Sequence, residues 1–587
     1  MKKKHSEIIP RLYKKLLPIQ IVLVVIGGIN AIIDNAFAAN MLGSGAMAVT
    51  GLFSPVSNFL IAVNMLFFGG AQVICGRYLG KNMAERTNGV FTLDLIVTFL
   101  VSIVLTALCE LIPGPISSAL GASGEQAVEL SRYIRGFAIG LPFYCLGSQL
   151  TAFLQLEHLE KLTYASAASL FASNVLLNWL FVGILKMGLF GLGLATSIGN
   201  ILFCVIQVIP YFSKKSTILF LPSRIQWGEL KDIVLNGLPA ATSQVCIFLR
   251  GILLNHLIAK YVGADGLAAF SAVISFNAIF WAVPAGVTSA VTVLGSVYAG
   301  EEDRAGLETL MRTFLRFGVV LVALVSVAYA LTCGPVTRIF YKDPSDPVYA
   351  MTLRGFMLYP LFAPFSTFVI GFSNYYHCLA QERLVRIIAL LDGIISVGLC
   401  ALILIPKFGM DGMWATQILG NVINELIIVL YAIIKNGKPI RSIRDLMLFP
   451  DNFGVPDEDR IDISIHNIEE VTRISESVWA FCDAHKVDKF RRYCASLCLE
   501  EMAGNIIQHG FTKDRKKHSL DIRVSYLREE LLLNIKDDCV PFNPVEVSKM
   551  FDPDDPTHNL GLRVTEGVTK NMSYQSTFGL NILSITI

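Results

Sequence analysis

Long apolar segments alternate with short polar ones along most of the chain, up to about residue 436. A helix needs about 20 apolar residues to cross a bilayer, and twelve segments reach that length. They are predicted at 16–39, 48–76, 88–112, 128–155, 163–185, 190–212, 232–260, 266–297, 311–334, 350–379, 385–405 and 413–435. The pattern therefore predicts an all-α polytopic membrane protein of about twelve transmembrane helices.

After Asp451 the pattern becomes that of a soluble domain. Residues 460–465 (RIDISI) alternate as a strand does, and 467–485 carry apolar residues at helical spacing. A second helix is predicted over about 488–509, and 519–538 are predicted to form a hairpin. Short strands with amphipathic helices indicate an α/β sandwich.

The composition fits a membrane protein. Only 16% of the 587 residues are charged, against about a quarter in soluble domains. A net charge of +2 lacks the large basic excess of a nucleic-acid-binding protein, so no nucleic acid is expected as a partner. The twelve cysteines include no pair of CxxC motifs, so neither a disulfide framework nor a zinc site is expected.

The distribution of Lys and Arg predicts the orientation, because these residues accumulate in cytoplasmic loops. With the N-terminus inside, the inner segments carry Arg77, Lys81, Arg86, Lys214, Lys215, Arg304, Arg312, Arg316 and the basic run after residue 434. The outer loops carry fewer, namely Lys186, Lys260, Arg338, Lys342 and Lys407. We therefore expect a plasma-membrane protein whose N-terminus and C-terminal domain are both cytoplasmic.

The membrane part also contains an internal repeat. Matching residues recur 220 positions apart, as in the pairs Asn35 and Asn255, Gly43 and Gly263, Tyr78 and Tyr298, and Gly80 and Gly300. Six helices per half is an even number, so the two halves are expected to share one topology, with the substrate site between them. The predicted domains are 1–215 and 216–440, a linker over 441–454, and a C-terminal domain over 455–587.

Three segments carry a family resemblance. The run PIQIVLVVIGGINAIIDNAFAANMLGSGAMAV at 18–49 resembles the first helix and loop of multidrug and toxic compound extrusion proteins. The segments GRYLGKNMAER at 76–86 and SVYAGEEDRAG at 296–306 are similar to that family's inner loops. The resemblance covers about 12–436. It implies export of cationic organic solutes or drugs in exchange for sodium or protons, by alternating access between the halves.

Asp34 is the main candidate for ion coupling. An ionisable side chain inside a membrane helix is costly and usually faces a cavity, where it can bind a proton or a cation. In the family that the chain resembles, an acidic residue in the first helix is a coupling-site candidate, and Asp34 matches it. The alternative is a helix-end carboxylate that reaches the outer interface. Asn35 and Asn178 can line the same cavity, and the alternative for each is a polar group that packs between helices.

In the second half, Arg250 and Asp392 are charged residues placed well inside predicted spans. Arg250 is expected to pair with Asp392 or with an anionic substrate, which would weaken the case for a purely cationic one.

The second helix of the soluble domain carries LCLEEMAGNIIQHGF, in which Glu501, Asn505 and His509 are spaced four apart and share one face. A carboxylate beside an amide can hold a hydrated magnesium ion and orient a hydroxyl toward a phosphate. On its own, this spacing is more often a solvated polar face.

The following segments IKDDCVPFNP, HNLGLRV and STFGLNILSITI complete a second resemblance. In this order they resemble the histidine-kinase-like ATPase fold, in its anti-sigma-factor serine kinase branch. The resemblance implies that Asn505 holds magnesium, Glu501 is the general base, Asp537 binds the adenine of ATP and Gly561 lies in the lid. Cys539 and Asn559 stand where that family has glycines, which puts nucleotide binding in question.

Two other functions remain open at this point. The protein can be a membrane-bound serine kinase that switches a serine-bearing anti-anti-sigma-like partner, with the transporter-like part sensing a ligand. It can also be a lipid-linked oligosaccharide flippase, although such proteins line their cavity with several basic residues. The chain lacks the phosphate loop of transport ATPases, so ATP is expected to regulate transport rather than to drive it.

Overall fold

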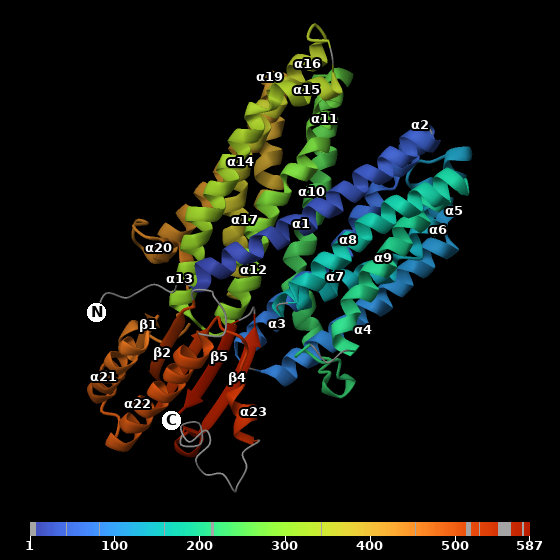
Figure 1. The fold of residues 1–587 in the computed structure, drawn as a ribbon. Coiled ribbons are helices and arrows are strands. Elements are labelled where there is room, and N and C mark those ends of the chain that lie inside the picture. The colour runs from blue at the N-terminus through green and yellow to red at the C-terminus, as the bar shows by residue number, and fades with distance from the viewer. Residues whose placement is uncertain are drawn as a thin grey trace.

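The structure is a computed structural model that describes residues 8–42, 44–81, 83–157, 159–212, 216–341, 343–451, 453–511, 518–527, 529–549, 565–577 and 580–587. It has three parts. Two helical units meet at the end where a small sheet domain lies, and they diverge toward the opposite end (Figure 1). We call the meeting end the sheet end.

The first helical unit takes up the chain to Phe212. It consists of α1 (Ile8–Phe37), η1 (Ala38–Leu42), α2 (Ser44–Leu52), α3 (Ser54–Gly80), α4 (Ala84–Leu111), α5 (Pro113–Ala119), α6 (Glu125–Ala138), α7 (Leu141–Leu156), α8 (Glu160–Asn178), η2 (Trp179–Ile184) and α9 (Gly188–Phe212).

The second helical unit follows the connecting turn η3 (Pro222–Arg224). It consists of α10 (Glu229–Tyr261), α11 (Ala264–Phe280), α12 (Ala282–Gly300), α13 (Arg304–Thr313), η4 (Phe314–Val319), α14 (Val320–Leu331), α15 (Cys333–Phe340), α16 (Pro347–Leu358), η5 (Tyr359–Phe362), α17 (Ala363–Cys378), α18 (Glu382–Leu390), η6 (Leu391–Ile395), α19 (Ser396–Asn436) and α20 (Ile443–Met447).

In the described part of the chain, ten helices are long and apolar enough to cross a membrane, or eleven if α6 and α7 form one bent span. The number is below twelve because Glu382–Asn436 counts once although it is 55 residues long. Gly409 breaks it with a non-helical φ of 56° and ψ of −130°, at the gap between the predicted spans 385–405 and 413–435. Each predicted span therefore has a helix or a helix pair as its counterpart.

The two helical units touch backbone to backbone at the sheet end. A Cβ on Gly237 of α10 would lie 1.6 Å from the main-chain oxygen of Leu66 on α3. A Cβ on Gly70 of α3 would lie 2.0 Å from the oxygen of Ile233 on α10. Only glycine allows such an approach, so this end of the bundle is closed by direct contact between α3 and α10.

The sheet domain is an α/β sandwich, as predicted. Its elements are η7 (Asp457–Asp459), β1 (Arg460–Ile465), α21 (Ile468–Ala484), α22 (Lys489–Asn505), η8 (Ile506–Gly510), β2 (Leu520–Leu527), β3 (Glu530–Asp537), α23 (Pro544–Lys549), β4 (Asn571–Thr577) and β5 (Leu580–Thr586). The five strands pair antiparallel in the order β1-β2-β3-β5-β4.

Strand alternation gives this sheet two faces. In β3 the side chains of Leu531, Leu533 and Ile535 are buried in a core with α21 and α22. The alternate residues Asn534 and Lys536 belong to the other face, which is turned toward the helical units (Figure 1). The domain boundaries predicted from the sequence remain predictions.

Candidate functional site

The Asp34 carboxylate lies in a polar cluster within the first helical unit. Its Oδ1 accepts a hydrogen bond from Asn178 Nδ2 of α8 at 2.7 Å. Its Oδ2 accepts one from Thr196 Oγ1 of α9 at 3.1 Å. Asn178 Nδ2 also donates to Asn174 Oδ1 at 3.1 Å. The carboxylate therefore faces α8 and α9 of its own unit, and its predicted place in a cavity stays a prediction.

The cluster contains a carboxylate without a counter-charge. Among the described residues no Lys or Arg forms an ion pair with Asp34. Asn178 is fully buried, and its Oδ1 has no hydrogen-bond partner in the described part of the chain. Because buried polar atoms are almost always satisfied, this oxygen and the carboxylate offer oxygen ligands to a bound cation. A proton on Asp34 would neutralise the carboxylate equally well.

Sequence reasoning found Asp34 and Asn178 but gave no role to Thr196. A threonine on an apolar helix gives no signal of its own, because it usually bonds the preceding turn. The main chain of Asn35 is described, but its side chain is outside the described part, so its predicted place in the cavity stays a prediction.

In the second helical unit the structure brings Arg250 and Asp392 together. Arg250 Nη1 donates to the main-chain oxygen of Asp392 at 3.0 Å, whereas the carboxylate Oδ1 accepts from Asn424 Nδ2 at 3.2 Å. Asp392 also lines a cavity of about 220 Å³ that Met65 of the first unit and Pro239 and Asn374 of the second help to form. This cavity between the units is a candidate part of a solute path.

Arg77 forms hydrogen bonds between the two units at the sheet end. From the sequence it was assigned only to the Lys and Arg residues of the inner segments. It lies on α3, and its Nη2 donates to the His377 oxygen at 2.7 Å and to Asn236 Oδ1 at 3.1 Å. Its Nε donates to the Cys378 oxygen at 3.0 Å. All three acceptors belong to the second unit. Which atoms accept these hydrogen bonds depends on how the two units pack, and the sequence around Arg77 does not encode that packing.

In the sheet domain, Glu501 and Asn505 line one pocket of about 270 Å³ between α21 and α22. Ile468, Thr472 and Gln508 are among its other lining residues. Glu501 is half-buried and Asn505 is exposed. A ligand that enters the pocket from solvent can therefore contact side-chain oxygen atoms of both residues. His509 lies beyond the helix end, on η8, and is not among the lining residues.

Asp537 ends β3 and is buried. Its Oδ1 accepts from the Cys539 amide at 2.9 Å and from Asn581 Nδ2 at 2.7 Å. Burial raises the pKa of Asp537, and the hydrogen bonds from Asn581 and from the amide and thiol of Cys539 oppose that rise. The carboxylate is therefore fixed in place, with the Cys539 thiol against it.

Cys539 takes the place of a family glycine without backbone strain. Its φ is not positive, so this position does not demand glycine. A Cβ on Gly510 would lie 3.1 Å from the Cys539 sulfur, so the thiol occupies space that Gly510 leaves open. Gly561 and Asn559, the other predicted nucleotide-site positions, lie outside the described residues.

Comparison with known proteins identifies both parts of the chain. The family model MatE matches residues 18–180 and 239–402, more than half of the sequence. The chain belongs to the MatE family. The two matched segments begin 221 residues apart, which agrees with the repeat predicted from the sequence. A second model, described as a histidine kinase-like ATPase domain, matches residues 466–587.

Relatives of this MatE protein include named transporters. The probable multidrug resistance protein NorM of Photorhabdus laumondii is 25% identical over 328 residues, which cover 53% of this chain and 70% of that protein. The multidrug export protein MepA of Staphylococcus saprophyticus is 22% identical over 394 residues, which cover 65% and 85%. A crystal structure of MATE in complex with MaL6 shares the fold, with a TM-score of 0.69 at 19% identity, and covers 73% of this chain and 96% of that one.

The chain is therefore a multi-pass membrane protein of the MatE family with a fused histidine-kinase-like ATPase domain, a fold that implies ATP binding.

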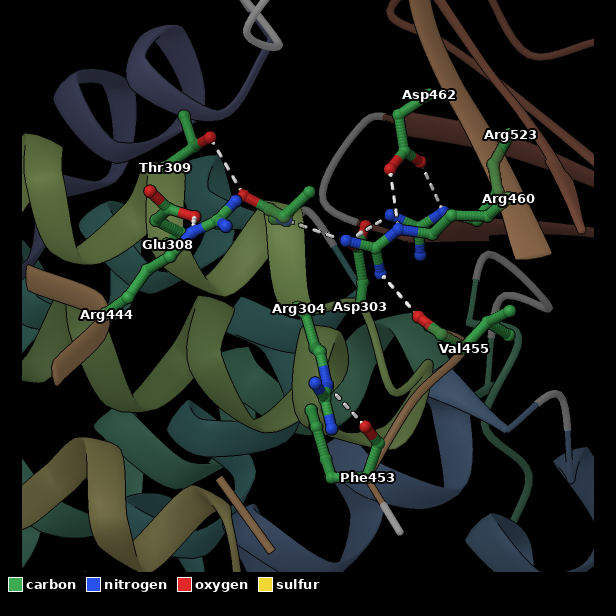
Figure 2. A network of polar contacts seen from close by, with 12 residues as sticks. Asp303, Arg304, Glu308, Thr309, Arg444, Phe453, Val455, Arg460, Asp462 and Arg523 are labelled. Carbon is green, nitrogen blue, oxygen red and sulfur yellow. Dashed lines mark hydrogen bonds and ion pairs between the residues drawn. The ribbon is translucent and has the colours of Figure 1, made fainter. Parts of the chain in front are cut away.

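The two domains are joined by ion pairs (Figure 2). Arg523 of β2 pairs with Asp303, which lies between α12 and α13. Arg523 Nε also bonds Asp462 Oδ1 of β1 at 2.5 Å, and Arg460 Nε lies 3.1 Å from Asp462 Oδ2.

The linker before β1 is bound to the same region of the MatE part. Arg304 Nε donates to the Phe453 oxygen at 2.5 Å, and the Gly454 amide donates to Glu302 Oε2 at 3.2 Å. Arg444 pairs with Glu308 of α13. Figure 2 shows the Arg304–Phe453 and Arg444–Glu308 contacts beside the Arg523 cluster. Sequence reasoning predicted none of these contacts.

Proposed function

We propose that this MatE protein exports organic, mainly cationic, solutes in exchange for sodium ions or protons, by alternating access between its two helical units. The observation that carries the proposal is the Asp34 carboxylate, which has two hydrogen-bond donors and no basic partner among the described residues. A carboxylate in apolar surroundings needs a proton or a cation to neutralise it. Release of that ion on one side of the membrane and rebinding on the other would couple its gradient to transport.

We further propose that the sheet end faces the cytoplasm. The support is the excess of Lys and Arg in the segments at that end, together with an ATPase domain, whose ligand is cytoplasmic. The plasma membrane is then the site of export.

ATP is proposed to bind the sheet domain with magnesium. Asn505 and Glu501 share a solvent-accessible pocket with oxygen ligands of the kind that magnesium prefers, and Asp537 would accept the adenine amino group. Bound Mg-ATP would supply the phosphoryl group, and Glu501 would act as the general base. The chain has a single such domain, so its proposed role is regulation of transport.

The Asp34 proposal is tested in liposomes that contain the full-length protein, a fluorescent organic cation and an imposed sodium or proton gradient. Asp34→Asn is expected to reduce gradient-driven export at least tenfold. The matched control is Asp411→Asn, which removes a carboxylate from an exposed pair with Arg354 and should export normally. Wild-type export by Asp34→Asn would overturn the proposal. Applying each gradient alone identifies the coupling ion.

A second candidate activity is transfer of a phosphoryl group to a serine of an anti-anti-sigma-like partner. It is supported by the pocket that Glu501 and Asn505 share, since a carboxylate there can accept the hydroxyl proton. Asp34→Asn should leave this activity intact, and Glu501→Gln should abolish it. The flippase alternative has less support, because Arg250 is occupied by the Asp392 main chain.

A further inference from the structure

The second face of the sheet, which does not contact α21 and α22, lies against the helical units. Lys536 of β3 pairs with Glu301, and its Nζ is 3.5 Å from Asp303 Oδ2. Lys536 and Glu301 expose only 12% and 11% of their side chains. Arg523 and Asp303 are similarly buried. Removal of one partner from a charge pair this deeply covered leaves an uncompensated buried charge, which costs more than breaking an exposed pair.

The protonation of this cluster agrees with its geometry. Burial alone would raise the pKa of Asp303, but the Arg523 guanidinium and the Lys536 ammonium outweigh it and hold that pKa below its usual range. The Glu301 and Asp303 carboxylates hold the pKa of Lys536 above its usual value, against the effects of burial and of the Arg523 guanidinium. Burial raises the pKa of Glu301, and Lys536 and Arg523 oppose that rise. The shifts of Asp303 and Lys536 both favour the charged forms at neutral pH.

The same sheet face also holds the first helical unit. Gln575 of β4 donates through Nε2 to the Leu79 oxygen, near the end of α3, at 2.8 Å. A cavity of about 580 Å³ is lined by this sheet face together with the segments 79–81 and 300–302. Gly80 and Gly300 are repeat equivalents, 220 residues apart. One sheet thus contacts the corresponding loops of both units.

These two loops lie directly at the closed end of the bundle. A Cβ on Gly80 would be 2.1 Å from the Val297 oxygen, and a Cβ on Gly300 would be 2.2 Å from the Arg77 oxygen. Separation of the units at the sheet end must therefore pull the loop at Leu79 away from the loop at Glu301. The sheet must release one of them before this end can open.

The two loops differ in charge. At the 220-residue offset, Glu301 and Asp303 of the second unit correspond to Lys81 and Met83 of the first. Among the described residues, Arg523 and Lys536 therefore have acidic partners on the inner loop of the second unit, whereas the polar contact of the sheet with the inner loop of the first unit is the amide hydrogen bond of Gln575. The pair of Asp538 with Arg11 reaches α1 of the first unit outside this loop. The weaker of the two attachments is the one expected to release.

Strand β3 connects this interface to the nucleotide residues. Lys536 faces the helical units, the next residue Asp537 is the proposed adenine partner, and Asp538 Oδ2 accepts from Arg11 Nη1 of α1 at 3.2 Å. A strand turns successive side chains to opposite faces. A shift of Asp537 on nucleotide binding would therefore move residues that contact the transporter.

From these contacts we propose that the ATPase domain is a latch on the sheet end of the transporter: docked across both inner loops it keeps the units closed there, and nucleotide acts on it through β3. The latch rests on the alternating access of the proposed function. Its release is the step that lets the protein open to the side on which the sheet domain lies.

The test uses full-length protein in liposomes, with spin labels at Ala84→Cys on α4 and Lys231→Cys on α10, both exposed near the sheet end. None of the native cysteines is exposed. The wild type is expected to show mainly one short distance. Lys536→Glu and Glu301→Lys should each raise the share of a longer distance at least threefold and speed up export, and the double variant should restore the short one.

Lys489→Glu is the matched control, because it makes the same charge change at an exposed residue of α22 and should leave the distances unchanged. The latch is overturned if Lys536→Glu and Glu301→Lys both give the distances of the wild type. Failure of the proposed function is seen separately, since Asp34→Asn would then export normally while the distances still respond to Lys536→Glu. In wild type shown to bind ATP, unchanged distances on adding Mg-ATP would overturn the link through β3.

Discussion

Arg77 of the first helical unit donates to the main-chain oxygen of His377 in the second unit over 2.7 Å. With its bonds to Asn236 and Cys378, one guanidinium ties three points of the facing unit. Because main-chain oxygens are among its acceptors, two of the three bonds do not depend on the partners' side chains. The closed end of the bundle thus has a polar fastening in addition to its glycine contacts.

Replacement of Arg77 by Ala should destabilise the closed state. A hydrogen bond to a charged group contributes about 1.5–3 kcal/mol, so loss of three should lower the melting temperature and favour opening at the sheet end. Differential scanning of the detergent-solubilised protein measures the first effect, and the label distance measures the second. Arg77→Lys keeps the charge but not the fork of donors, and should show an intermediate loss.

Gly237→Ala should separate α3 from α10. The added Cβ would lie 1.6 Å from the Leu66 oxygen, and overpacking of this kind costs about 1–3 kcal/mol or more. We expect a lower melting temperature and slower export. Gly251→Ala is the matched control on the same helix, since a Cβ there meets nothing within 4 Å; it should be neutral or stabilising. Equal behaviour of the two variants would contradict the proposed closure by contact.

Cys539→Gly should strengthen ATP binding. Removing the thiol would free the Asp537 carboxylate from a competing donor and leave room for the base. Loss of a competing hydrogen bond of about 1 kcal/mol corresponds to roughly fivefold tighter binding, measured by calorimetry on the full-length protein. Cys539→Ser keeps a donor at this position and should bind no more tightly than the wild type. A weaker affinity of the glycine variant would mean that the thiol supports the pocket.

Asn505→Ala and Glu501→Gln should separate binding from transfer. Loss of the Asn505 amide should remove the magnesium-dependent part of ATP affinity, about tenfold or more if one charged contact of about 1.5 kcal/mol is lost. Glu501→Gln should retain ATP binding and lose transfer to a serine-bearing protein. Titrations with and without magnesium check the first effect, and a phosphate-transfer assay checks the second. Identical affinities of Asn505→Ala and the wild type would remove Asn505 from the site.

The sequence predicted the features that depend on local pattern. Apolar length predicted the spans, and the repeat predicted that Gly80 and Gly300 are equivalent. The polarity of Asp34 and Asn178 in apolar helices was enough to nominate both, and the structure joins them by a hydrogen bond. Each of these inferences needs only the order of residue types along the chain, within one segment or between the two repeats.

The interdomain contacts could not be predicted in this way. Lys536 alternates out of the core of β3, and a lysine in that position is ordinarily solvated. Nothing in its neighbourhood along the chain indicates that Glu301, 235 residues earlier, covers it. The orientation of one folded domain on another is set by surfaces that assemble only after each domain has formed.

The difference between the two inner loops has a consequence for how the domain chooses its position. A transporter built from two related halves offers a bound domain two similar binding surfaces, related by half a turn about the membrane normal. Glu301 and Asp303 make one of them attractive to Arg523 and Lys536, and Lys81 makes the other repulsive. The approximate symmetry of the helices is thus broken by a few charges, so the sheet domain has one defined orientation on a nearly twofold partner.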